Sequence, residues 1–414
     1  SQQQLAALVA SPYARAPRRP DAERVLVDFG SPNMGKELHV GHLRSSVVGD
    51  TIARLLEFLG HDVTRLSHVG DAGLPIAIVL AEYFMRAFGS IPRGASDAQL
   101  RTMLDAADAA WMRDADAASL LPSAHELSSV YESAKRQMDT AGKAAAGVPS
   151  ALADAHAAAR ATHFAADAQQ LLRDLQAVLA GSALPEGASP AYAGFLKHAW
   201  TQLCAASRAG YEPLFQRLGV QVTEAGESTY ADGLASVVEE LQRSGVATLS
   251  DGALVLFVDG ADKSPLLIRK ADGGFLYATT DLVCLRRRLE GGFTRIVYIT
   301  DQSQAVHFRQ VFAAARMAGW ITPDGRNALS RDRLPVSLEH AYFGVVTGEG
   351  GRKLSSRDGT PHTLASLLAE GDAAATRACL GAPDATAAAA AAATANAGSE
   401  ATSDAAAAAA AATG

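Results

Sequence analysis

The sequence predicts an α/β protein in which a doubly wound parallel sheet is interrupted by a helical insertion. Two strand-helix units open the fold. The apolar run Val25 to Val27 leads into Asp28 and has the length of a buried strand, and apolar residues from Leu43 to Leu59 then repeat with a helical period. A second unit begins with a strand at 62–66 and continues as a helix to about residue 85. Strands resume after residue 220, beyond a long helical stretch, and they supply the other half of the sheet.

The pattern divides the chain into five segments. We expect a linker at 1–24, the first half of the sheet domain at 25–91, a mainly helical insertion at 92–219, the second half at 220–371 with a glycine-rich loop at 344–359, and an alanine-rich tail at 372–414. Strands near 245–249, 254–259, 266–270, 295–300 and 336–338 are expected in the second half. Residues 141–184 are rich in alanine, so we expect loose packing there. The tail has few large apolar side chains, which predicts disorder or a fraying alanine helix.

Composition excludes some classes of protein. No apolar run approaches the roughly 20 residues that span a bilayer, so we expect no membrane contact. The net charge of -7 argues against a protein that coats nucleic acid broadly. The cysteines Cys204, Cys284 and Cys379 are odd in number and far apart, as in reduced intracellular proteins. We expect a cytoplasmic monomer, with an organelle as the alternative compartment.

The segment from Ser31 to His42 carries the strongest chemical signal. It reads SPNMGKELHVGH and joins the end of the first strand to the start of a helix. A helix N-terminus offers N–H groups to a phosphate, Gly41 allows close approach, and His39 and His42 can donate hydrogen bonds to a phosphoryl group. Alternatively, the two histidines are a helix-start residue and a core residue. A zinc pair would need further ligands that do not lie nearby, so we expect no metal site.

Five ordered motifs strengthen this interpretation. The histidine segment is followed by HVGDAG at 68–73, GES at 226–228, KADGGFLYATTD at 270–281, QAVHF at 304–308 and EHAYFGVV at 339–346. Together they resemble the catalytic domain of arginyl-tRNA synthetases over about residues 25–371. The resemblance implies a Rossmann-like, HUP-type class I synthetase core that makes arginyl-adenylate from L-arginine and ATP and transfers arginine to tRNA(Arg). ATP would carry Mg2+, and no prosthetic group is implied.

The resemblance also implies an arginine site. Glu227, Tyr277 and Asp281 would hold the guanidinium, and Asp28, Asn33 and Gln304 would hold the α-amino and carboxylate ends. Carboxylates suit this role because guanidinium presents a fork of donors. Each acid has a local alternative, since Glu227 and Asp281 stand where they could cap helices.

Departing pyrophosphate needs positive charge, for which Lys36, Lys353 and Arg357 are the candidates. The loop with Lys353 and Arg357 takes the place of the mobile signature loop of class I synthetases. His307 is either a nucleotide contact or a satisfied helix-start histidine. The ATP-binding residues implied by the resemblance are His39, Gly41, His42, Gly70, Asp71, His307, Phe343, Gly344, Val345 and Lys353.

The chain departs from the family at several positions. Ala72 and Pro75 replace a usual Trp and Gln, and Ser355 and Ser356 stand where a basic residue often lies. The C-terminal anticodon-binding domain of the family has no counterpart, so we expect weak tRNA binding. Two alternatives follow: a non-catalytic ATP- and tRNA-binding paralogue, or a nucleotidyltransferase with the HxGH motif that needs no tRNA.

Overall fold

The computed structural model describes residues 20–103, 124–146, 152–184, 187–258, 264–344 and 363–380. The chain divides into two compact units, residues 1–361 and 362–414. The predicted signature loop, with Val345, Lys353 and Arg357, lies outside the described residues.

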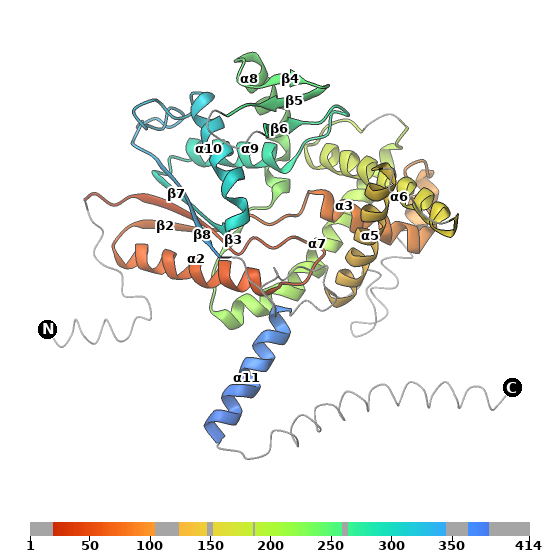
Figure 1. The fold of residues 1–414 in the computed structure, drawn as a ribbon, viewed down its shortest axis with the longest axis horizontal. Helices are drawn as coiled ribbons and strands as arrows, with labels where there is room; N and C mark the ends of the chain where they lie inside the picture. The colour runs from red at the N-terminus through yellow and green to blue at the C-terminus, as the bar shows by residue number, and fades with distance from the viewer. Residues whose placement is uncertain are drawn as a thin grey trace. The chain divides into compact units, whose positions relative to one another are not determined.

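A five-stranded parallel sheet forms the centre of the first unit (Figure 1). Its strands are β1 (Arg24–Asp28), β2 (Asp62–Ser67), β3 (Thr223–Glu224), β7 (Arg295–Asp301) and β8 (Ser337–Phe343), in the order β3-β2-β1-β7-β8. Val25 of β1 is in register with Val63 on one side and with Arg295 on the other. The chain therefore winds outward from β1 in both directions, which confirms the predicted doubly wound sheet. In such sheets ligands bind at the carboxyl ends of the strands, where the order reverses.

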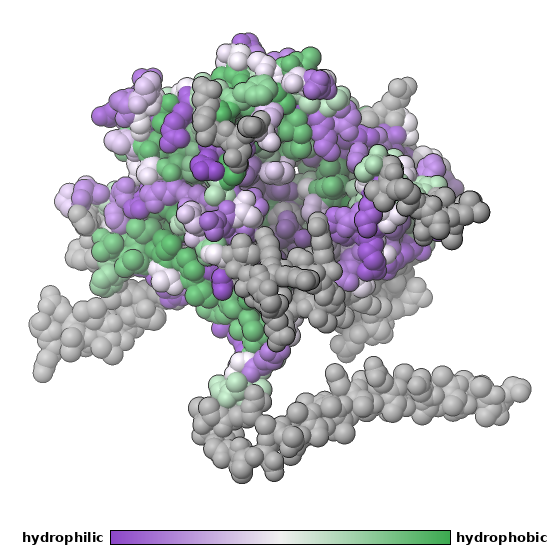
Figure 2. Space-filling model, viewed as in Figure 1, coloured by the Kyte–Doolittle hydropathy of each residue, from purple (hydrophilic) through white to green (hydrophobic). Residues whose placement is uncertain are grey.

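Helix α2 (Val40–Phe58) packs on the sheet through its small residues. Ser46, Gly49 and Ala53 are buried, and a Cβ atom at Gly49 would collide with the Phe29 ring. Close approach to the sheet needs small side chains, and several larger apolar ones turn outward. Exposed apolar side chains of α2 and of its C-cap residue form a hydrophobic patch in Figure 2 and belong to Val47, Val48, Leu55, Phe58 and Leu59.

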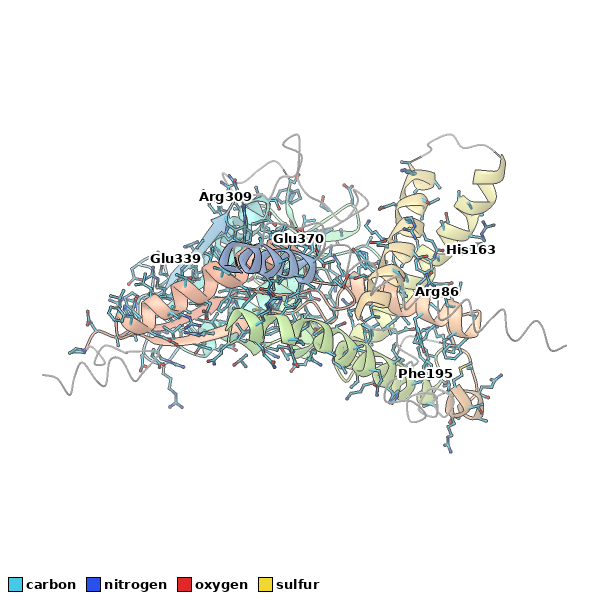
Figure 3. The ribbon with its side chains drawn as sticks, turned by 90° about the horizontal axis from the view of Figure 1, so that it is seen from below. Arg86, His163, Phe195, Arg309, Glu339 and Glu370 are labelled. Atoms are coloured by element: carbon cyan, nitrogen blue, oxygen red, sulfur yellow. The ribbon has the colours of Figure 1, made fainter. Side chains whose placement is uncertain are left out.

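The insertion is a helical bundle beside the sheet. It consists of α5 (Ala124–Ala145), α6 (Leu152–Leu179) and α7 (Pro190–Leu218), packed with α3 (Leu74–Phe88). The expectation of loose packing at 141–184 is wrong for the part of α6 whose side chains are described, because Phe164, Leu171 and Leu175 are at most 2% exposed. Alanine between these residues lets the helices approach closely. Figure 3 shows Arg86, His163 and Phe195 in this helical part, and Arg309 and Glu339 on the side of the sheet.

A second, antiparallel sheet corrects the predicted sheet membership. Strands β4 (Thr248–Ser250), β5 (Ala253–Leu256) and β6 (Leu266–Arg269) pair with one another and, among the described residues, with no strand of the parallel sheet. The sequence marked strands here but wrongly joined them to the parallel sheet. Short loops between these strands favour antiparallel pairing, because parallel strands need a long crossover.

Helices surround the two sheets and share one hydrophobic core with them. The elements are η1 (Glu227–Gly233), α8 (Leu234–Arg243), α9 (Tyr277–Glu290), η2 (Gln302–Gln304) and α10 (Ala305–Met317). Helix α10 follows β7, and near the start of α9 Asp281 contacts His307 of α10 and His68 after β2, so both helices begin near the carboxyl ends of the parallel strands.

The second unit contains α11 (Leu364–Leu380) among its described residues. This helix crosses the expected boundary at residue 371, so residues 372–380 adopt the helical alternative for the tail. No helix in the described part of the chain is long and apolar enough to cross a membrane.

Candidate active site

His39 and His42 form a reciprocal cap at the start of α2. The His39 Nδ1 atom accepts a hydrogen bond from the Gly41 amide at 3.0 Å, and the His42 Nδ1 atom accepts one from the His39 amide at 3.1 Å. The two ring centroids lie 4.0 Å apart. A neutral imidazole that accepts at Nδ1 carries its proton on Nε2, so each ring has an Nε2–H group that can act as a donor.

The charge state of His42 follows from its surroundings. Burial lowers the pKa of His42 well below its usual value, and the neighbouring His39 and Lys36 lower it further. His42 is therefore neutral at pH 7. A neutral donor suits a group that meets the charge growing on phosphate oxygens, because it needs no protonation step.

Gly41 is required by this cap. A Cβ atom at residue 41 would lie 2.8 Å from Cε1 and 3.0 Å from Nδ1 of His39. A side chain would push the His39 ring out of its position. The glycine thus keeps the imidazole in place as well as the backbone accessible.

The ends of β1 and β7 are tied to α2 through Ser45. Its Oγ accepts a hydrogen bond from the Gly30 amide at 3.0 Å and donates one to the Ile299 carbonyl at 2.7 Å. Arg44 donates to the Gly344 carbonyl at 2.9 Å, which anchors the chain just after β8. The histidine cap therefore has a fixed position relative to the three strands.

Asp281 is the centre of a cluster of titratable side chains near the same edge. His307 Nε2 lies 2.6 Å from Asp281 Oδ2, and His68 Nε2 lies 3.8 Å from Oδ1. The Tyr277 ring is tilted by 55° against the His307 ring, with their centroids 4.9 Å apart. Helix α9 begins at Tyr277 with Leu276 as its N-cap, so Asp281 does not cap this helix. Its side chain is 19% exposed and can still meet a ligand.

Glu227 belongs to the same group of acids. Burial and the nearby Asp281 and Asp71 raise the pKa of Glu227 to about 7, although His68 acts in the opposite direction. Glu227 begins η1, whose N-cap is Gly226. A carboxyl group in this state is ionised only in part at neutral pH, and an incoming cation would complete its ionisation.

Asp28 has a partner that the sequence did not reveal. Arg288 donates from Nη2 to Asp28 Oδ2 at 2.6 Å, and both side chains are at most 6% exposed. Ser31 Oγ donates to the other oxygen at 3.1 Å, and the His68 amide does so at 3.3 Å. The Asp28 carboxylate therefore lies beneath the site and is already engaged from several sides.

The remaining predicted residues take different positions. Asp71 is 3% exposed and accepts from the amide and hydroxyl of Ser228 at 2.8 and 2.6 Å, so it joins the end of β2 to η1. Gly70 pairs with Asn33 in a parallel bridge. Asn33 and Gln304 are exposed, and Phe343 ends β8 beside exposed Gly344.

His68 and Arg288 are site residues that sequence reasoning missed. His68 directly follows β2, where ligand-facing residues of parallel sheets are found. Burial lowers its pKa, but Cys284 and the carboxylates of Asp281 and Asp28 together raise the pKa of His68 above its usual range. Asp281, Cys284 and Arg288 are spaced three and four residues apart on α9, a spacing that places them on one helical face.

A doubly wound sheet with a histidine cap after its first strand and carboxylates near the same edge defines a class of nucleotide-handling α/β proteins. Comparison with known proteins identifies the family within this class. The family model for tRNA synthetases class I (R), catalytic domain, matches residues 4–91 and 108–392. The chain therefore belongs to this catalytic-domain family.

Curated proteins of similar sequence support this family assignment. The chain is 36% identical over 373 residues to an arginine–tRNA ligase of Nostoc punctiforme and 37% identical over 373 residues to one of Nostoc sp.. Each match covers 89% of this chain and 52% of the relative, so the chain spans about half the length of these proteins.

Solved structures share the fold. The arginyl-tRNA synthetase of Plasmodium falciparum matches with a TM-score of 0.57 at 24% identity, over 87% of this chain and 47% of that chain. The Thermus thermophilus arginyl-tRNA synthetase matches with a TM-score of 0.53 at 19% identity, over 92% and 57% respectively. The predicted Rossmann-like class I core is thus confirmed.

Proposed function

We propose that this chain activates L-arginine with ATP and transfers the arginyl group to tRNA(Arg). The observation that carries the proposal is the placement of two Nε2–H donors and a group of carboxylates near one edge of one sheet. The likeness to curated arginine–tRNA ligases over most of this chain supports the same substrate.

Arginine would enter with its guanidinium toward Asp281 and Glu227. The flat cation can donate to both carboxylates at once, and the Tyr277 ring can cover its face. Because His307 Nε2 already contacts Asp281 Oδ2, a bound guanidinium would share this carboxylate with the imidazole.

The amino-acid end would be held by exposed polar groups. We assign Asn33 and Gln304, which are both exposed, to the α-amino and carboxylate ends. Because Arg288 already engages Asp28, we assign Asp28 to fixing the floor of this site, with at most one oxygen shared with the substrate.

In the chemical step a carboxylate oxygen of arginine attacks the α-phosphorus of ATP. The bond from that phosphorus to the bridging oxygen breaks, and pyrophosphate leaves. His39 and His42 donate from Nε2 to the α-phosphate oxygens, whose charge changes during the attack. Lys36, and Lys353 and Arg357 outside the described residues, would balance the charge of pyrophosphate. A hydroxyl at the tRNA 3′ end then attacks the arginyl carbonyl, and AMP leaves.

Mg2+ would enter with ATP and be held mostly by phosphates and water. Within the described ranges, no three His, Cys, Asp or Glu side chains are arranged to hold a metal ion. The free thiols of Cys204 and Cys284 support a reducing compartment, and we place the protein in the cytoplasm.

Arginine-dependent exchange of labelled pyrophosphate into ATP tests the proposal, with and without tRNA(Arg). We expect exchange with arginine and far less with lysine or ornithine, which lack the planar fork of donors. Equal exchange with lysine would contradict the proposal that Asp281 and Glu227 bind a guanidinium group. Saturable ATP binding without exchange would favour the non-catalytic alternative.

His42→Ala tests the role of the histidine cap in the same assay. Loss of a transition-state donor should lower the exchange rate by about a hundredfold or more. His163→Ala on α6 is the matched control, because His163 is an exposed histidine outside the site. An exchange rate for His42→Ala equal to that of the control would remove His42 from the mechanism.

A further inference from the structure

The segment that carries Lys36 is held by the helical insertion. The Glu37 amide donates to Ser128 Oγ of α5 at 2.9 Å, and the Gly35 amide donates to Ser207 Oγ of α7 at 2.8 Å. These two bonds flank Lys36 on either side in the sequence. The backbone of the segment is therefore fixed by side chains from two insertion helices.

The turn at Gly35 adds a third constraint. Gly35 has a φ of +81°, which disfavours other residues, and a Cβ atom there would lie 3.1 Å from Val79 Cγ2 of α3. The direction in which Lys36 leaves the backbone is thus set by the packing of the segment against α3, α5 and α7.

The Lys36 side chain also meets the insertion. Its Nζ atom lies over the Tyr131 ring of α5, 4.5 Å from the ring centroid. A cation at this distance is attracted to the negative face of the ring. Residues 128 and 131 are three apart on α5, so one face of this helix supplies both the backbone contact and the aromatic contact.

The position of this ammonium bears on the histidine cap. The charge of Lys36 is close enough to His42 to help lower the pKa of that imidazole. The ammonium therefore acts on the residues that would meet the phosphates of ATP.

We propose that Tyr131 is a positioning residue that holds the Lys36 ammonium beside the histidine cap for the phosphates of ATP, so that the helical insertion sets the charge at the nucleotide site. This inference rests on the proposed function and deepens it. Tyr131 acts through Lys36 and is not itself assigned a contact with substrate.

Calorimetric titration with ATP in the presence of Mg2+ tests the proposal in five variants of the full chain, which include Lys36→Met alone and combined with Tyr131→Leu. Tyr131→Leu removes the ring and should weaken ATP binding by about three- to tenfold, a range that reflects one cation–π contact. Tyr131→Phe keeps the ring and should bind within about twofold of the unmodified chain. In a Lys36→Met background, Tyr131→Leu should cause no further loss. Glu132→Ala, an exposed change at the adjacent position of α5, is the control.

Several outcomes would overturn the proposal. Tighter ATP binding in Tyr131→Leu would mean that the ring withholds Lys36 from the nucleotide. An equal loss in the Lys36→Met background would mean that the ring acts through helix packing. Undiminished binding in Tyr131→Leu, or no ATP binding by any form of the chain, would also refute it.

A second measurement follows the contact itself. The rate of reductive methylation of Lys36, read by mass spectrometry, should rise severalfold in Tyr131→Leu and stay unchanged in Tyr131→Phe. An unchanged rate in Tyr131→Leu would contradict the contact. Failure of the proposed function is distinguishable, because it would show as absent arginine-dependent exchange while the ATP-binding pattern of these variants persists.

Discussion

At the scale of single residues, the site uses side chains that serve the fold and the chemistry together. His39 and His42 accept hydrogen bonds from backbone N–H groups at the start of α2. Because these bonds occupy Nδ1, the proton of each imidazole is on Nε2. Arg288 neutralises Asp28 beneath the site and fixes it. Rigid placement of this kind costs no rearrangement when charge develops on the substrate.

The raised pKa of Glu227 predicts a pH-dependent affinity for arginine. Below pH 7 the Glu227 carboxyl is mainly neutral, and above pH 7 it is mainly ionised and attracts guanidinium. Binding should therefore strengthen by up to about tenfold from pH 6 to pH 8, as the ionised fraction of one group rises. Calorimetric titration with arginine across this range measures the effect.

Glu227→Gln is the control for this prediction. It should bind arginine more weakly and lose most of the pH dependence, because the amide does not titrate. A pH dependence that persists unchanged in Glu227→Gln would assign it to another group, such as the neighbouring Asp71, whose pKa is also raised by burial.

The buried pair Arg288–Asp28 predicts a large effect on stability. Arg288→Met leaves the Asp28 carboxylate buried without its cation, which costs about 3–5 kcal/mol of unfolding free energy. Arg136→Met on α5 removes an exposed ion pair with Glu132 and should change it by less than about 1 kcal/mol. Urea unfolding of both variants measures the difference. Equal stability of the two variants would show that Asp28 finds other partners.

At the scale of elements, the helix α2 shows where sequence pattern and packing diverge. Apolar periodicity correctly indicated a helix, but the contact face was set by the small residues at 46, 49 and 53. Hydrophobicity patterns register large apolar side chains and overlook the glycine or serine that permits close approach. The helix was therefore predictable, and the face that it buries was not.

This packing makes Gly49→Ala a direct test. The added methyl would collide with Phe29, and overpacking in a core costs about 1–3 kcal/mol of unfolding free energy. The change from glycine to alanine in a helix returns about 1 kcal/mol, so we expect a net loss of stability. Val48→Ala on the exposed face should stay within about 0.5 kcal/mol. Thermal unfolding monitored by circular dichroism compares them. A Gly49→Ala variant more stable than the unmodified chain would contradict the close packing of α2.

At the scale of the whole molecule, the parallel sheet was predictable from the sequence. The second sheet and the contacts between distant residues were not. Strand-helix alternation predicted a doubly wound parallel sheet, because parallel strands require crossovers. The sequence did not reveal that residues 248–269 form a separate sheet, because short apolar runs look alike in either setting. The partnership of residues 28 and 288 joins positions far apart in the chain, and only the fold brings them together.

The helical insertion contributes contacts to the proposed site. Its helices fix the segment from Gly35 to Glu37 through Ser128 and Ser207, so the nucleotide side of the site depends on packing contributed from outside the sheet. The sequence showed this bundle only as an alanine-rich helical insertion. In the structure its helices fix the backbone on both sides of Lys36 in the proposed active site.

A crystal structure of the chain with a non-hydrolysable sulfamoyl analogue of arginyl-adenylate tests the central claim most directly. We predict the guanidinium within hydrogen-bond distance of Asp281 and Glu227, and the sulfamoyl group, which stands in for the phosphate, beside the Nε2 atoms of His39 and His42. An analogue bound with its guanidinium in solvent, or with its sulfamoyl group away from both imidazoles, would contradict the account.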